Sequence, residues 1–158
     1  MSEDARFEDG GERPLNLGAF DADDLQVISA LVQDAVLPVT EIKWQPNQRR
    51  LGLLLNRVRW EDVDAAKKRG RPVERVQALL VIEGVLGMAS QGVDRSDKDM
   101  ILSVLSVTFE EGEAPSGHVV LTLAGDGAIR AQVEALELTL RDVTRPYVAP
   151  SGKTPDHG

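Results

Sequence analysis

The stretch RRLGLLLNRVRW, residues 49 to 60, has a period of two, and this pattern limits the fold more than any other feature of the sequence. Leu51, Leu53 and Leu55 fall on one side of an extended strand. The other side carries Arg50, Gly52, Leu54 and Asn56. Beyond Asn56 the apolar side switches to Val58 and Trp60, which we interpret as a β-bulge. With VTEIKWQ before it and a Pro-Asn turn between, the stretch predicts a β-hairpin over residues 39 to 60.

One helix is predicted near the N-terminus. Asp21 can cap it, and acidic side chains in its first turn favour the positive end of the helix dipole. Apolar residues follow at helical spacing, namely Leu25, Ile28, Leu31, Val32 and Ala35. Pro38 is expected to end this helix.

The rest of the chain favours strands. PLNLGAF (14 to 20) predicts a short strand, VERVQALLVIEGVLGM (73 to 88) one buried strand, and DMILSVLSVTFE (99 to 110) a central strand with bulk on both faces. Gly125-Asp126-Gly127 predicts a hairpin turn. Residues 128 to 143 satisfy both a helical stripe and two strand segments, and we favour strands because a tight turn precedes them.

These elements predict an α+β fold, with one N-terminal helix and a mostly antiparallel, about seven-stranded curled sheet or barrel. The 158 residues suffice for one domain. We expect a flexible acidic N-terminus at 1–13, a single α+β domain at 14–148 and a disordered tail at 149–158. No apolar run approaches the roughly 20 residues that span a bilayer, and the acidic start resembles no secretory signal, so we expect a cytoplasmic protein without a membrane partner.

The charge of the chain is uneven. Residues 43 to 75 hold ten Lys/Arg against four Asp/Glu, whereas the remainder holds eight against twenty-two, in a chain of formal net charge −8. The basic segment is a candidate anion or partner surface, formed by Arg49, Arg50, Arg57, Arg59, Trp44 and Trp60. The alternative is a solvated sheet edge whose arginines meet the protein's own carboxylates and prevent strand pairing between molecules. We favour this alternative, because inward leucines would scatter the arginines over two faces.

Motifs for chemistry are weak throughout. The chain has no cysteine, and its two histidines, His118 and His157, are far apart. DRSDKD (94 to 99) lacks the glycine and the final glutamate of a calcium loop. SGKTP lacks the upstream glycine of a phosphate-binding loop, and no G-x-S-x-G elbow occurs. We therefore predict no catalytic residue, no metal site and no cofactor.

DLQVISALVQDAV, RRLGLLLNRVRWE and GAIRAQVEALELTLRD, in this order, resemble the bacterial family called domain of unknown function 2948. The resemblance runs from about Leu15 to Val143. It implies a small stand-alone cytoplasmic protein. The family has no assigned activity, cofactor or catalytic residue to carry over.

Three functions stay open at this point. We favour a small non-catalytic soluble domain that acts through protein contacts, with a protein partner or a homodimer formed through an exposed sheet edge. The first alternative is nucleic-acid binding through residues 43 to 75. The second is a small-molecule enzyme with a noncanonical pocket, which a deep cavity would support.

Overall fold

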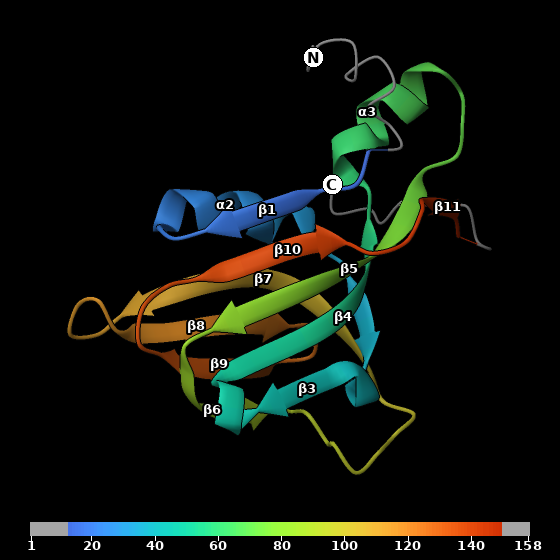
Figure 1. Cartoon of the computed structure of the whole chain (residues 1–158). Helices are drawn as coiled ribbons and strands as arrows, with labels where there is room; N and C mark the ends of the chain where they lie inside the picture. The colour runs from blue at the N-terminus through green and yellow to red at the C-terminus, as the bar shows by residue number, and fades with distance from the viewer. Residues whose placement is uncertain (1–12, 150–158) are drawn as a thin grey trace.

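The computed structural model describes residues 13–149, which form two layers of antiparallel strands with two α-helices at one end (Figure 1). The first half contains β1 (Asn16–Ala19), α2 (Ala22–Leu31), β2 (Val36–Pro38), η2 (Val39–Glu41), β3 (Ile42–Gln45), η3 (Pro46–Gln48), β4 (Arg50–Val58) and α3 (Trp60–Lys68). The second half contains β5 (Glu74–Glu83), β6 (Val85–Gln91), β7 (Ile101–Glu111), β8 (Gly117–Leu123), β9 (Gly127–Val133), β10 (Leu138–Asp142) and β11 (Tyr147–Val148).

The strands form one eleven-stranded sheet with the order β1-β10-β5-β4-β2-β7-β8-β9-β6, to which β3 adds beside β4 and β11 beside β5. Every pairing in the described part of the chain is antiparallel. Strand β2 links a front layer of β1, β10, β5, β4 and β3 to a back layer of β7, β8, β9 and β6 (Figure 1). The α+β class and the antiparallel sheet are confirmed. The predicted count of about seven strands and the barrel are wrong, because the sheet has eleven strands and does not close.

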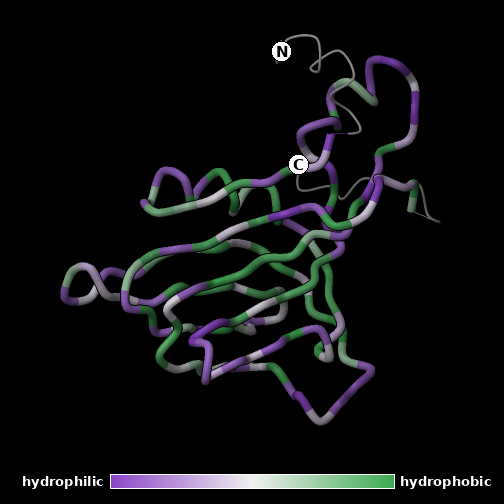
Figure 2. The backbone as a smooth tube through the Cα atoms, in the orientation of Figure 1, coloured by the Kyte–Doolittle hydropathy of each residue, from purple (hydrophilic) through white to green (hydrophobic). Residues whose placement is uncertain are grey.

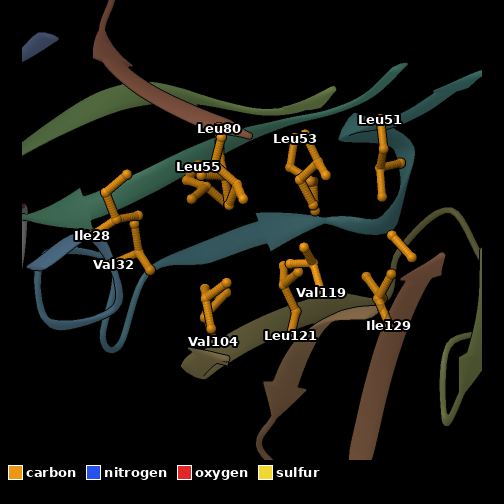
Figure 3. Close-up of a cluster of buried hydrophobic side chains, with 14 of the residues drawn as sticks. Ile28, Val32, Leu51, Leu53, Leu55, Leu80, Val104, Val119, Leu121 and Ile129 are labelled. Carbon is orange, nitrogen blue, oxygen red and sulfur yellow. The ribbon is translucent and has the colours of Figure 1, made fainter. Parts of the chain in front are cut away.

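The core lies between the two layers. Leu51, Leu53 and Leu55 point from β4 toward Val119 and Leu121 of the back layer (Figure 3). The alternation in the sequence therefore places these leucines as predicted, each fully buried. Burying a leucine side chain stabilises the fold by roughly 1.5–3 kcal/mol. This row of leucines thus fixes which face of β4 is left outside.

Helix α2 fills one end of the core. Asp21 caps it by accepting a hydrogen bond from the Asp24 backbone N–H at 2.8 Å, and Leu25 and Ile28 are buried. The helix ends at Leu31, several residues before Pro38, with Val32 as its C-cap; Asp34, with a left-handed φ of 63°, lies in the turn between the helix and β2. The helix is confirmed, but its end was predicted too late.

Two other predictions are wrong. The single strand expected over 73 to 88 is two strands, because Gly84 has a φ of 66°, which turns the chain between β5 and β6. The supposed bulge beyond Asn56 is the end of β4, and Trp60 begins α3. Helix α3 covers Trp60–Lys68.

The two hairpins are confirmed, although the first covers residues 42 to 58 and not 39 to 60. Strand β3 pairs with β4 across η3, and β8 pairs with β9 across the Gly125-Asp126-Gly127 turn. Residues 128 to 143 contain strands β9 and β10, so strands replace the helical alternative. The predicted flexible N-terminus and tail fall almost wholly in residues 1–12 and 150–158, outside the described residues. Within residues 13–149 no helix is both long and apolar enough to cross a membrane.

Candidate binding site on the outer sheet face

A groove of about 700 Å³ lies on the outer face of the front layer, opposite the core. Strands β3, β4, β5 and β10 carry most of it, and β1 borders it. Its lining residues are Asn16, Glu41, Lys43, Gln45, Arg50, Gly52, Leu54, Leu79, Val81, Glu83, Thr139 and Arg141. We call it the outer groove.

The floor of the outer groove is apolar. Leu54 pairs with Leu79, and Gly52 pairs with Val81, so these four residues form two adjacent rows on β4 and β5. All four are half-buried, whereas their neighbours along each strand are fully buried in the core. Figure 2 shows the resulting hydrophobic colour along the central parts of both strands. The central parts of β4 and β5 are therefore apolar on both faces, which is unusual for a face open to water.

Gly52 leaves a gap in this floor. A Cβ atom added there would meet no atom within 4 Å, and its backbone is not in the left-handed region. Within residues 13–149, no turn or close approach explains the glycine. A glycine inside a strand weakens the strand, and it often marks a place where a ligand comes close to the backbone. The geometry of Gly52 fits an occupant from outside the sheet.

Charged side chains border this floor. Arg50 binds Glu83 through Nε at 3.0 Å, and both are on the rim. Lys43 and Arg141 make no ion pair with any carboxylate of the described residues. They lie on β3 and β10, three strand spacings or roughly 14 Å apart across the groove. The rim is net positive in a chain of net charge −8. Its cations are Lys43, Arg50 and Arg141, and its anions are Glu41 and Glu83.

A shallower hollow of about 450 Å³ lies beside the groove, around β3 and η2. It shares Lys43 and Gln45 with the outer groove and adds Trp44 and Arg95. Positive charge thus continues from the groove around β3, next to the partly buried ring of Trp44.

A second cluster of charged side chains lies where α3 joins the sheet. Arg57 is fully buried and donates two hydrogen bonds to Asp142, at 3.1 and 3.0 Å, and two to Glu61, at 2.9 and 2.8 Å. Arg59 donates to Glu74 at 2.5 Å and lies 3.4 Å from Asp62. We call this set, completed by Arg71, the α3 anchor.

The α3 anchor is electrostatically satisfied. Burial opposes ionisation of Glu61, but hydrogen bonds and charge from Arg57 outweigh it and hold the pKa of Glu61 below its usual value. Hydrogen bonds from Arg71, at 2.7 and 3.0 Å, lower the pKa of Asp62. In the described residues no buried side-chain nitrogen or oxygen lacks a hydrogen-bond partner. The cluster therefore holds α3 against β4, β5 and β10, and its buried donors are bonded within the chain.

The six residues of the sequence-predicted surface do not come together. Arg49 pairs with Glu134, and Arg50 lies on the rim of the outer groove. Arg57 and Arg59 are buried in the α3 anchor. Trp44 lies on β3, whereas Trp60 begins α3 and donates its indole N–H to the Gln33 carbonyl at 2.8 Å. Trp44 pairs with Leu51 and Trp60 follows Val58, so the two tryptophans lie at opposite ends of the Leu51–Val58 segment, which is roughly 23 Å long.

The interpretation of these arginines as a solvated sheet edge is wrong for the strand that carries them. Strand β4 is central, with β5 on one side and β2 and β3 on the other. The expectation that the arginines meet the protein's own carboxylates is confirmed for Arg49, Arg50, Arg57 and Arg59. Lys43 and Arg141 could not be placed at one site from the sequence, since only the strand order brings them to one groove.

Metal chemistry has no support in residues 13–149. No group of three or more His, Asp or Glu side chains there could hold a metal ion. Asp94 in the DRSDKD loop accepts hydrogen bonds from Ser96, at 3.0 Å from its N–H and 2.5 Å from its hydroxyl. These bonds close a local turn.

Comparison with known proteins gives a match to a family model. The sequence model of the family described as "Protein of unknown function (DUF2948)" matches residues 15–157, nearly the whole chain. Neither the curated proteins nor the solved structures contain a match.

Proposed function

The chain belongs to the DUF2948 family, whose description assigns no activity, and from its own geometry we propose that it is a non-catalytic binding domain. It acts through protein contacts at the outer groove. The occupant is a segment of a partner polypeptide that places an apolar side chain over Gly52 and carboxylates near Lys43 and Arg141.

The gap at Gly52 is the observation that carries this proposal. It lies between Val81 on β5 and Lys43 on β3, the register partners of Gly52 on either side. An apolar side chain placed there would cover Val81 and the aliphatic stem of Lys43. Removing apolar surface from water contributes about 25 cal/mol per Å². An apolar side chain of the occupant therefore gains the most burial free energy at Gly52, where the sheet has no side chain of its own.

Charge supports an acidic occupant. Lys43 and Arg141 flank the apolar floor without ion-pair partners among the described residues. Exposed ion pairs contribute only about 0.2–1 kcal/mol each, so the apolar contact supplies affinity and the two cations select the segment. Arg50 is already paired with Glu83 and contributes less.

The side chains of the groove favour binding over catalysis. The lining has no serine, cysteine or histidine, and Thr139 provides its one hydroxyl. Glu83 is already ion paired with Arg50. The site therefore offers an apolar surface and fixed charges, which are the elements of recognition.

Nucleic-acid binding through residues 43 to 75 has weaker geometric support. Five arginines of that segment are ion paired within the chain, namely Arg49, Arg50, Arg57, Arg59 and Arg71. Single-strand binders need aromatic rings beside free cations. Only Trp44, with Lys43 and Arg95, offers that combination here.

Selection from a random peptide library tests the proposal. We expect the immobilised full chain to enrich peptides with an apolar residue flanked by Asp or Glu, and we expect these to bind Gly52→Val at least tenfold more weakly. Enrichment of no sequence class, or equal binding to Gly52→Val, would overturn the proposal. Binding of a single-stranded oligonucleotide at low salt, without acidic peptides, would replace it with the nucleic-acid alternative.

Gly87→Val is the matched control. Gly87 is also a strand glycine outside the left-handed region, but it lies in the back layer, opposite Gln132 on β9. A Cβ atom there would meet only the Gln132 side-chain oxygen, at 3.8 Å. This variant should bind the selected peptides as the parent does.

A further inference from the structure

We infer that the partner segment adds to the sheet as an extra strand along the free edge of β3. This inference rests on the proposed function, because the added strand continues the segment that binds the outer groove. It also names the form of the partner, which is an extended stretch of alternating apolar and acidic residues beside the groove-bound residues.

The edge of β3 is open to such a strand. Strand β3 borders the front layer (Figure 1), and within residues 13–149 it pairs with β4 alone. An unpaired strand edge presents N–H and C=O groups that another chain can bind. In β-augmentation, an extended peptide makes main-chain hydrogen bonds to an edge of this kind.

The hydrogen bonds of β3 show which backbone groups face this edge. Ile42 directs its N–H away from β4, since it donates to the Val39 carbonyl and closes η2. Backbone groups of an antiparallel strand alternate between its two sides. Those of Lys43 and Gln45 therefore bond to β4, whereas the Trp44 N–H, the Trp44 carbonyl and the Ile42 carbonyl face outward. These three groups have no hydrogen-bond partner within residues 13–149.

The hollow of about 450 Å³ beside β3 lies along this edge. All four residues of β3 line it, together with Val39, Thr40 and Arg95. Successive side chains of a strand point to opposite faces, so a hollow that touches all four residues lies beside the backbone and not on one face. The hollow therefore gives an added strand access to the outward backbone groups.

The side chains around the hollow select the sequence of the added strand. Its charged lining residues are Lys43 and Arg95, and neither forms an ion pair with a carboxylate of the described residues. Acidic side chains on the outer face of the added strand would lie beside Lys43, and opposite charges on neighbouring strands support pairing. On the inner face the neighbour is Trp44, which packs against the core, so apolar side chains fit there.

One segment can reach both the edge and the outer groove. Lys43 and Gln45 line the groove as well as the hollow, so the two are continuous. The added strand would lie two strand spacings, roughly 10 Å, from Gly52, because β3 lies between it and β4. About three extended residues span this distance.

N-methylation of a selected acidic peptide tests the added strand. Each backbone N–H of the peptide is methylated in turn, and calorimetric titration measures the affinity for the full chain. We expect losses of about fivefold or more at two alternate positions, which donate to the carbonyls of Ile42 and Trp44. The position between them faces away from β3 and is the matched control, with a smaller loss. Equal affinities at all positions would overturn the inference.

Hydrogen exchange places the contact on β3. With saturating peptide, exchange of the Trp44 N–H should slow by about tenfold or more, while the N–H of Asp126, in the turn between β8 and β9, keeps its rate. Arg95→Gln should weaken peptide binding by up to about fivefold, whereas Lys98→Gln, in the same exposed segment, should bind like the parent. Unchanged exchange at Trp44 would overturn the inference.

These measurements separate the inference from the proposed function. Loss of binding in Gly52→Val, without the alternating effect of methylation or slower exchange at Trp44, would reject the added strand and keep the groove. Slower exchange at Trp44, with equal binding to Gly52→Val, would keep the edge of β3 as a binding site and reject the gap at Gly52. Selection of no peptide would reject both.

Discussion

Arg57 and Asp142 form a buried ion pair that joins the end of β4 to the end of β10 across β5. Arg57 donates Nε and Nη2 to the two carboxylate oxygens at 3.1 and 3.0 Å, and the side chains are 0% and 2% exposed. Asp142 also accepts the Leu15 N–H, and Arg57 also binds Glu61 of α3. These connected contacts therefore tie β4, β10, α3 and the start of β1 together.

Replacing one member of this pair should destabilise the fold strongly. Arg57→Met leaves the Asp142 carboxylate buried without its cation, and breaking a buried pair in this way costs about 3–5 kcal/mol. Urea denaturation measures this loss. A change below about 1 kcal/mol would show that Asp142 finds water or another donor.

The double substitution Arg57→Met with Asp142→Leu separates the energy of the ion pair from the cost of leaving one charge buried without its partner. Since no charge is left unpaired between these positions, we expect it to lose less stability than the two single variants together. Additive losses would show that the two side chains act independently.

The α3 anchor predicts a loss of stability in acid. The pKa values of Glu61 and Asp62 lie below their usual 4.5 and 3.8 in the folded chain. The folded state therefore binds fewer protons than the unfolded state, so the stabilisation is complete above about pH 4.5 and is lost as pH falls through the lowered values.

Unfolding free energies measured from pH 6 to 2.5 check this. Glu61→Gln with Asp62→Asn should flatten the acid slope, whereas Asp64→Asn, an exposed position on the same helix, should leave it unchanged. An unchanged slope in the double variant would place the acid sensitivity elsewhere.

The alternation along β4 predicts that substitutions at neighbouring positions act differently, one on stability and the next on peptide binding. Leu53 is fully buried, so Leu53→Ala should cost about 3–5 kcal/mol. Leu54 lies on the floor of the outer groove, so Leu54→Ala should cost about 1 kcal/mol or less while it weakens peptide binding. Chemical denaturation and peptide titration measure the two effects. Equal losses of stability would mean that the groove face is covered within the chain.

The rim cations predict a salt-dependent part of the affinity. Lys43→Gln or Arg141→Gln should each weaken an acidic peptide by up to about fivefold, with a smaller effect of added salt than in the parent. Lys98→Gln, exposed in the segment between β6 and β7, is the control and should bind like the parent. Unchanged affinity in both rim variants would exclude Lys43 and Arg141 from recognition.

Much of the fold could be predicted because its signals are local. The leucines of β4 alternate strictly, Asp21 caps α2, and Gly125-Asp126-Gly127 forms a tight turn. The start of α3 has no such signal, since its N-cap residue, Arg59, makes no side-chain capping bond. Gly84 lies within a stretch that is apolar apart from Glu83, so the sequence predicts one strand there and no turn.

The candidate site could not be predicted, because it depends on strand order and register. Lys43 and Arg141 are distant in sequence, and they flank one floor only because β3 and β10 lie on either side of β4 and β5. The burial of Arg57 has a similar origin. Its carboxylate partner Asp142 is 85 residues away.

Recognition at the outer groove depends most on the gap at Gly52, and binding by the Gly52→Val variant tests it most directly. Since valine favours strands and meets no atom there, the variant should be as stable as the parent or more stable by about 0.5–1 kcal/mol. Calorimetric titration with a selected acidic peptide should show at least a tenfold loss of affinity, with none in Gly87→Val. A stable Gly52→Val variant that binds the peptide like the parent would contradict the account.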